Sequence, residues 1–134
     1  MINPTKYIRD AIIKAIKPIE CFTVRVPKDK NHLTSYVILN SEVINEYAEC
    51  KTSNEWLLSI NLDVTHLGML GYDYTAKVDD MIESIIPKIK SLKQPILTIK
   101  NVTLTASNTL NYDTTTNSIN RKVLTFEIWV GYER

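Results

Sequence analysis

A regular alternation of side chains near the middle of the chain restricts the fold more than any other stretch. Every second residue is large and apolar: Trp56, Leu58, Ile60, Leu62 and Val64. The residues between them are mostly polar. A period of two is typical of a strand with one buried face and one face in water. The stretch therefore predicts a long strand in a sheet that buries one of its faces.

The composition favours a sheet-rich domain around this strand. Ile, Val and Thr supply 40 of the 134 residues, and such β-branched side chains pack well on a pleated surface. Hydrophobic residues make up 44% of the chain, which is enough for a folded core. The length suits one domain, so we expect residues 1–134 to fold as a single unit.

Two segments carry apolar residues at the spacing of an amphipathic helix. The first covers about residues 4–17, with Asn3 as its N-cap and Pro18 at its end. The second covers about residues 74–86, and we expect it to end at Pro87 or close to it. Because each helix has one apolar face, both are expected to pack on one face of the sheet.

Further strands are expected at about residues 21–26, 36–47, 96–110 and 119–132. The phase of the apolar residues changes near Lys100, which predicts a bulge there. The polar residues between the last two strands are typical of a hairpin tip. The predicted fold is α+β: a mainly antiparallel sheet, two amphipathic helices packed on one face, and a long C-terminal β-hairpin.

The sequence carries no recognisable motif of catalysis or ligand binding. Cys21 and Cys50 match neither a redox motif nor a zinc knuckle, so we interpret them as reduced thiols. No HxH or HxxxH pair involves His32 or His66, and the three glycines do not form a phosphate-binding loop. We therefore predict no catalytic residue, no metal ion and no cofactor, and we expect that the protein is not an enzyme.

The overall charge and the apolar runs exclude two classes of partner. A formal net charge of +1 argues against sequence-specific binding of nucleic acid, which needs a basic surplus. The longest uninterrupted apolar run covers residues 36–39, far below the roughly 20 residues that cross a bilayer. The first residues show no signal peptide, so we expect a soluble protein without a membrane partner.

The near-neutral total conceals a strong variation along the chain. Residues 1–41 carry a net charge of +4, residues 42–83 carry −7, and residues 84–134 carry +4. Two interpretations remain open. The segments either neutralise one another within the folded monomer, or they give the subunit two complementary faces. A subunit of the second kind associates head to tail and forms a ring if the rotation closes.

The order of elements resembles that of the tail-terminator and tail-completion proteins of tailed bacteriophages, which are small ring-forming proteins of the virion neck. The stretches that carry the resemblance are residues 7–16, 36–39, 55–64, 78–86 and 121–128. The family typically opens its second block with a Pro-Tyr-Val-like sequence, and this chain has Ser35-Tyr36-Val37 there, without the proline. The similarity covers nearly the whole length of the chain.

The resemblance implies a structural virion protein that assembles in the host cytoplasm. Its ring, of six or twelve copies, would join the portal or connector to the tail or terminate the tail, and DNA would pass through it without sequence-specific contact. Acidic residues of one copy are then expected to meet lysines of the next. These are Glu42, Glu46, Glu49 and Glu55 on one side and Lys88, Lys90 and Lys93 on the other. The polar hairpin 108–120, with Tyr112 and Asp113, is expected to reach an adjoining subunit or ring.

Two other functions fit the same sequence. One is a small cytoplasmic ligand-binding or regulatory domain of α+β fold, which would be dimeric and have a concave apolar pocket. The other is an enzyme whose site is built from residues far apart in the chain. The oligomeric state distinguishes the ring from both.

Overall fold

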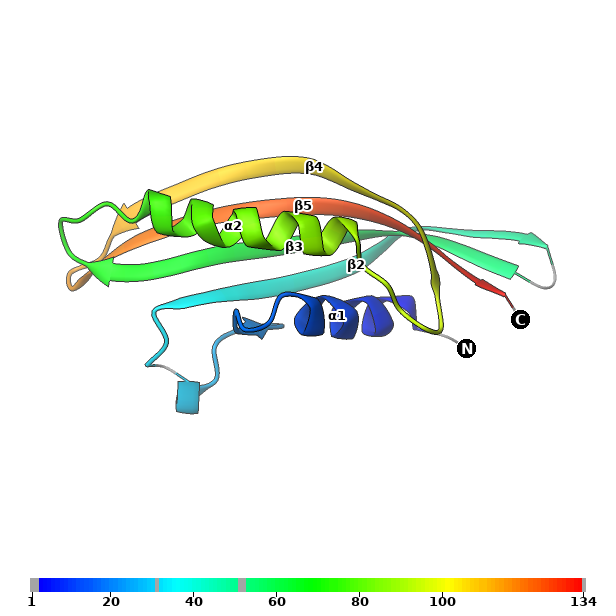
Figure 1. The fold of residues 1–134 in the computed structure, drawn as a ribbon, viewed down its shortest axis with the longest axis horizontal. Coiled ribbons are helices and arrows are strands. Elements are labelled where there is room, and N and C mark those ends of the chain that lie inside the picture. Colours follow the sequence, from blue (N-terminus) through cyan, green and yellow to red (C-terminus); the bar gives the residue numbers. More distant parts are fainter. Residues whose placement is uncertain (1–2, 31, 51–52, 134) are drawn as a thin grey trace.

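Four long strands form the body of the molecule, and two helices cover one of their faces (Figure 1). The computed structural model describes residues 3–30, 32–50 and 53–133, and the side chains of residues 47–50, 53 and 133 lie outside that description. The elements in chain order are α1 (Pro4–Ala15), β1 (Cys21–Phe22), the short 3₁₀ helix η1 (Lys28–Lys30), β2 (Ser35–Cys50), β3 (Ser53–Met69), α2 (Thr75–Lys90), β4 (Thr98–Asp113) and β5 (Asn117–Glu133).

The strands form one sheet in the order β1-β2-β3-β5-β4. The α+β class with two helices is confirmed, and β4 and β5 make the long hairpin that was expected. The sheet is mixed, because β1 runs parallel to β2 whereas the three other pairings are antiparallel. The expected strand 21–26 forms only at its first two residues, since the chain bends at residues 23–25.

The core lies between the helices and one face of the sheet. All five alternating residues of the central strand are buried there, as the sequence predicted. The other large contributors are Ile8, Ile12 and Ile16 of α1, Ile82, Ile85 and Ile89 of α2, and Leu124, Phe126, Ile128 and Val130 of β5. Each fully buried side chain of this size stabilises the fold by about 1.5–3 kcal/mol.

Helix α2 continues past Pro87, so the prediction that this proline ends the helix is wrong. A proline inside a helix costs about 3 kcal/mol because it removes a backbone hydrogen bond. The extra turn buries Ile89 and is followed by the buried Leu92, and burial of two such side chains offsets that cost. The hydroxyl and the N–H of Ser91 then donate to the Pro87 carbonyl, at 2.9 and 3.1 Å, and close the helix.

The predicted bulge in β4 is confirmed, because the register with β5 shifts between Ile99 and Asn101. A second shift, between Leu104 and Ala106, was not predicted. The hairpin tip is also shorter than residues 111–118, since both strands continue almost to Thr114, whose N–H donates to the carbonyl of Asn117 at 2.8 Å.

Candidate subunit interface

The outer edge of β2 carries exposed carboxylates beside exposed apolar side chains. Strand β1 covers β2 only at Val37 and Ile38, so residues 42–46 lie on an open edge. Val43 and Ile44 are 43% and 44% exposed. Within the described part of the chain, neither of the flanking residues, Glu42 and Glu46, forms an ion pair. We call residues 42–46 the acidic edge. Apolar groups exposed among charges are typical of protein contact surfaces.

A groove with the opposite charge runs along the start of β4. It has a volume of about 670 Å³, and the end of α2, the following connector and the first residues of β4 line it. Its basic residues are Lys90, Lys93 and Lys100, and no carboxylate lines it. Among the residues that the structure describes, Lys90 and Lys93 have no ion-pair partner. We call this surface the basic groove.

The acidic edge and the basic groove lie at the same level on opposite edges of the sheet. The residue row that starts at Glu46 crosses β3 and β5 and ends at Ile99 of β4. The row that starts at Glu42 ends at Thr103. Lys100 lies between the two row ends. The two edges of one copy are therefore complementary to each other rather than to themselves, which is the condition for head-to-tail contact.

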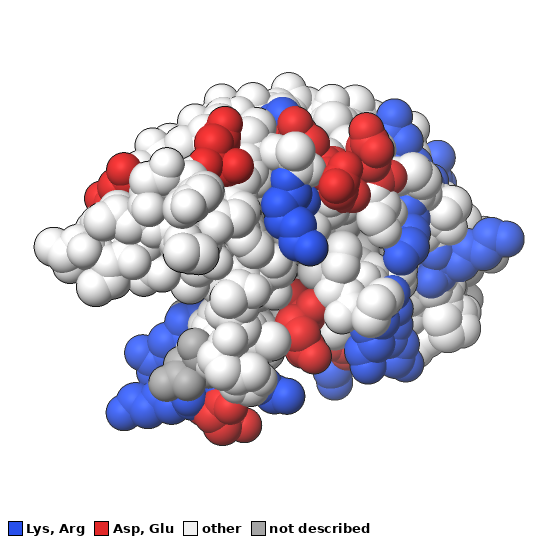
Figure 2. Space-filling model, turned by 60° about the vertical axis from the view of Figure 1, so that its left-hand side comes forward, with Lys and Arg blue, Asp and Glu red and all other residues white. Residues whose placement is uncertain are grey.

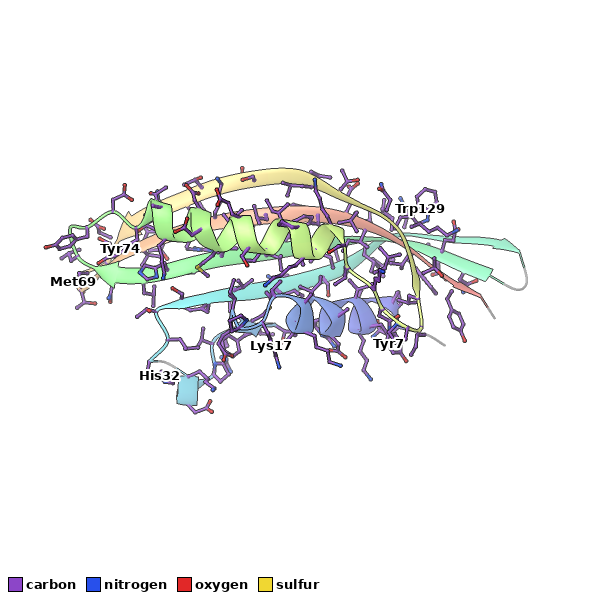
Figure 3. All side chains as sticks on the ribbon, viewed as in Figure 1. Tyr7, Lys17, His32, Met69, Tyr74 and Trp129 are labelled. Atoms are coloured by element: carbon purple, nitrogen blue, oxygen red, sulfur yellow. The ribbon has the colours of Figure 1, made fainter. Side chains whose placement is uncertain are left out.

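Glu55, which was expected at the interface, finds its partner within the chain. The residue is 6% exposed, and its side chain forms an ion pair with Lys100. The lysine reaches it by crossing Gly131, where a Cβ atom would lie 3.1 Å from its Cε atom. Its Nζ atom lies 6.0 Å from the ring centre of Trp129 (Figure 3). Glu55 is therefore not part of the interface that we propose below.

The other expected interface residues are spread over the surface. Lys88 is half-buried in a second groove, of about 580 Å³, between α1 and the connector 91–96, and Lys93 lines it as well. Tyr112 is 48% exposed near the tip of the β4–β5 hairpin. Asp113 accepts a hydrogen bond of 2.9 Å from the Ser118 hydroxyl across that tip. The side chain of Glu49 lies outside the described residues.

The acidic and basic residues are only partly separated on the surface, because Lys100, Arg121 and Lys122 of the basic C-terminal segment form ion pairs with Glu55, Asp63 and Asp79 of the acidic middle segment. Figure 2 shows carboxylates mainly along the upper part of one face and basic side chains mainly at its right and lower left. Helix α2 contributes to both groups, with Asp79, Asp80 and Glu83 in its middle and Lys88 and Lys90 in its last turn. The two lysines suit the helix dipole, which favours cations at the C-terminus.

The helix-free face of the sheet carries polar pairs. Arg121 binds Asp63 through two hydrogen bonds, and the Nε–Oδ1 distance is 3.1 Å. This carboxylate raises the pKa of the guanidinium group. Burial, followed by the charge of Asp63, raises the pKa of Tyr36 beside it. The pairs cover the middle of the sheet with contacts that stay within the chain.

Sequence reasoning missed a cluster around His66 at the end of β3. Its Nδ1 atom shares a hydrogen bond of 2.6 Å with the hydroxyl of Ser35, and its ring centre lies 4.7 Å from that of Tyr74 (Figure 3). Burial, with a smaller effect of Lys77, lowers the pKa of His66. Ser35 precedes His66 by 31 residues, so no local spacing signals the contact. The cluster ties the start of β2 to the end of β3.

Two further features bear on chemistry and location. Within residues 3–30, 32–50 and 53–133, no group of three His, Cys, Asp or Glu side chains is arranged to hold a metal ion. Neither helix in the described part of the chain combines the length and the apolar character needed to span a bilayer.

No model of a known protein family matches the sequence, and no curated protein matches it. The functional proposal therefore depends on the sequence pattern and the geometry above.

Proposed function

We propose that the chain is a structural subunit of a ring in the neck or tail of a tailed-bacteriophage virion. The ring joins the head connector to the tail or terminates the tail. One observation supports the proposal most strongly. The acidic edge and the basic groove carry opposite charges and lie on opposite edges of one sheet, at the same position along the strands. A contact between such edges uses a different surface on each copy, and repeated rotation closes it into a ring.

The strand directions suit the same arrangement. Strands β2, β3, β5 and β4 alternate in direction, so the outer strands β2 and β4 are antiparallel to each other. When a copy is repeated by rotation about an axis along the strands, β4 of one copy lies antiparallel to β2 of the next. The acidic edge then faces the basic groove without a shift along the axis.

The charges act mainly on register and on the rate of association. Exposed ion pairs contribute about 0–1 kcal/mol each and weaken as salt screens them. The exposed Val43 and Ile44 add apolar area to the contact. The ring of six or twelve copies is therefore expected to form most readily at low ionic strength, with portal or connector and tail proteins as its other partners.

Native mass spectrometry and negative-stain imaging of the purified chain test the ring. Closed rings of six or more copies are expected. The variant K90E/K93E should remain folded and fail to assemble, and E42K/E46K/K90E/K93E should recover assembly because it exchanges the charges. The control K6E/K28E makes the same change in charge at two exposed lysines outside the basic groove.

The virion role is tested separately. Antibodies against the chain are expected to label purified tailed particles at the head–tail junction or at an end of the tail. A stable dimer that binds a small molecule would instead support the regulatory domain and contradict the ring. Unchanged rings in K90E/K93E would contradict the pairing of charges.

A further inference from the structure

One part of the outer strand β4 has none of the features that normally protect a sheet edge. Residues 106–112 are all exposed, contain no charged residue and no proline, and keep an uninterrupted register with β5. Strand β4 is the last strand of the sheet, so nothing within the described chain pairs with its outer side. We call residues 106–112 the uncharged edge.

Proteins usually protect open edges with charges, prolines or bulges, because an unprotected edge accepts another strand. The rest of this sheet follows that rule. The open part of β2 has two glutamates and a register shift between Val43 and Asn45, and the first half of β4 has Lys100 and two bulges. The uncharged edge is the exception, and its backbone groups are available for strand addition.

The opposite edge of the sheet offers an unfinished strand. Strand β1 consists of two residues, although the sequence continues the strand pattern through Val24 to Val26. In the structure the chain bends there, and Val24 is 79% exposed, the highest value among the exposed large hydrophobic side chains. Residues 23–26 therefore have the sequence pattern of a strand without a strand conformation. Pairing with an edge strand of another copy would allow them to adopt it.

The uncharged edge and β1 match in three respects: their position along the strands, their antiparallel direction, and the face of the sheet on which paired side chains lie. The row through Cys21 crosses β2, β3 and β5 and ends at Thr109, and the row through Phe22 ends at Asn108. Continued by two residues, the register would place Val24 on the row that ends at Ala106. Strand β1 runs antiparallel to β4. Because side chains alternate between the faces, the two ends of each row lie on the same face.

We propose that the uncharged edge of one copy pairs with β1 of the next copy in the ring, and that residues 23–26 then straighten and extend β1 along it. The pairing rests on the proposed ring and identifies the second contact between its subunits. The acidic edge and basic groove form the first, at one end of the strands, and the uncharged edge and β1 form the second. Together they join the sheets of neighbouring copies into one continuous band.

Disulfide cross-linking tests the pairing. The variant C50S/T109C leaves Cys21 and the new thiol at facing positions on the helix-covered side. Burial raises the pKa of the Cys21 thiol to about 11, so copper phenanthroline is used as the oxidant instead of thiol exchange. Rings oxidised in this way should give a ladder of linked subunits on a non-reducing gel, up to the full ring number.

Matched variants show which pair is formed. The control C50S/N108C places the thiol on the other face of the same strand and should give at least tenfold less product. In C21S/C50S/T109C the ladder should disappear. Linked dimers in this last variant would mean that β4 pairs with β4 of another copy, and they would overturn the proposal.

Hydrogen exchange gives an independent measurement that needs no new thiol. Amides of residues 106–112 that point outward should exchange at least tenfold more slowly in the ring than in unassembled K90E/K93E. If rings are seen but cysteines at positions 107, 109 and 111 all fail to link to Cys21, and exchange is unchanged, the pairing is wrong and the ring stands. If no variant or condition gives rings, both proposals are wrong.

Discussion

The two ends of the sheet differ in how their polar groups are paired. Where β3 ends and α2 begins, the groups find partners within the chain: the Asn120 side chain accepts from the Tyr74 N–H, and the Ser118 hydroxyl accepts from the Gly71 N–H, both at 3.1 Å. At the other end, the glutamates of the acidic edge and two lysines of the basic groove have no ion pair in the part of the chain described. The first end is therefore closed by contacts within the chain, whereas the second combines the Glu55–Lys100 ion pair with charges that the proposed interface would use.

The largest effect is expected at Gly68, where the ring of Tyr74 packs directly on the backbone. A Cβ atom there would overlap that ring, so G68A should lower the free energy of unfolding by about 3 kcal/mol. Urea denaturation measures the loss. The control is G131A at the opposite end, where the new atom is 3.1 Å from the flexible side chain of Lys100 and at an ordinary contact distance of 3.8 Å from the Asn54 carbonyl oxygen. It should cost less than about 1 kcal/mol. Equal losses would show that the two ends are packed alike.

A smaller loss is expected when Lys100 is removed from its ion pair. The variant K100M removes the ion-pair partner that the structure describes for the buried carboxylate of Glu55, which should cost about 2 kcal/mol. The double variant E55Q/K100M removes the charge as well and should recover part of that stability. If K100M alone were neutral, Glu55 would have to be solvated, and the ion pair would contribute little to this end of the sheet.

The His66 cluster predicts a dependence on pH at the first end. Because burial lowers the pKa of His66 in the folded protein, the unfolded chain binds the proton more readily. The stability from this residue is complete above the unfolded pKa of about 6.5 and decreases as the pH falls through that value towards the folded pKa. Urea midpoints between pH 8 and 5 should show the decrease. H66Q should reduce it, whereas H32Q, at an exposed histidine, should not.

The smallest effect on stability is expected at the acidic edge. E42Q/E46Q should change the free energy of unfolding of the monomer by no more than about 0.5 kcal/mol, because both side chains are exposed and form no ion pair with any residue that the structure describes. The same variant should need higher protein concentrations to form rings and should lose the salt dependence of assembly. A clear loss of monomer stability would mean that this end, too, is held by contacts within the chain.

Sequence patterns predicted the features that depend on neighbouring residues. The alternation from Trp56 to Val64 identified the buried face, and the change of phase near Lys100 identified a bulge. The prediction at Pro87 was wrong because the burial of Ile89, a property of the tertiary structure, outweighed a local preference. In the same way, the length of β1 depends on whether another strand lies beside it.

Sequence patterns could not predict the contacts at the two ends of the sheet. Glu55 and Lys100 are 45 residues apart, and their approach depends on the register of three strands and on Gly131. Ser35 and His66 meet only because β2 and β3 pair in one particular register. The charge blocks along the chain were visible, but the strand order was needed to place Glu42 and Glu46 on one edge of the sheet and the basic groove beside the other. Whether those edges meet in a ring remains a prediction.

The position of β5 between β3 and β4 has a consequence for synthesis. The segment that pairs with both of these strands is the last of the five to leave the ribosome. While β5 is still missing, β1 and β2 have their strand neighbours available, β3 has only β2, and β4 has none. The basic groove and the uncharged edge both lie on β4, so a nascent chain offers at most one of the two sides that a ring contact needs. In the proposed ring, a chain can therefore accept a neighbour on its β4 side only after β5 has paired with β4.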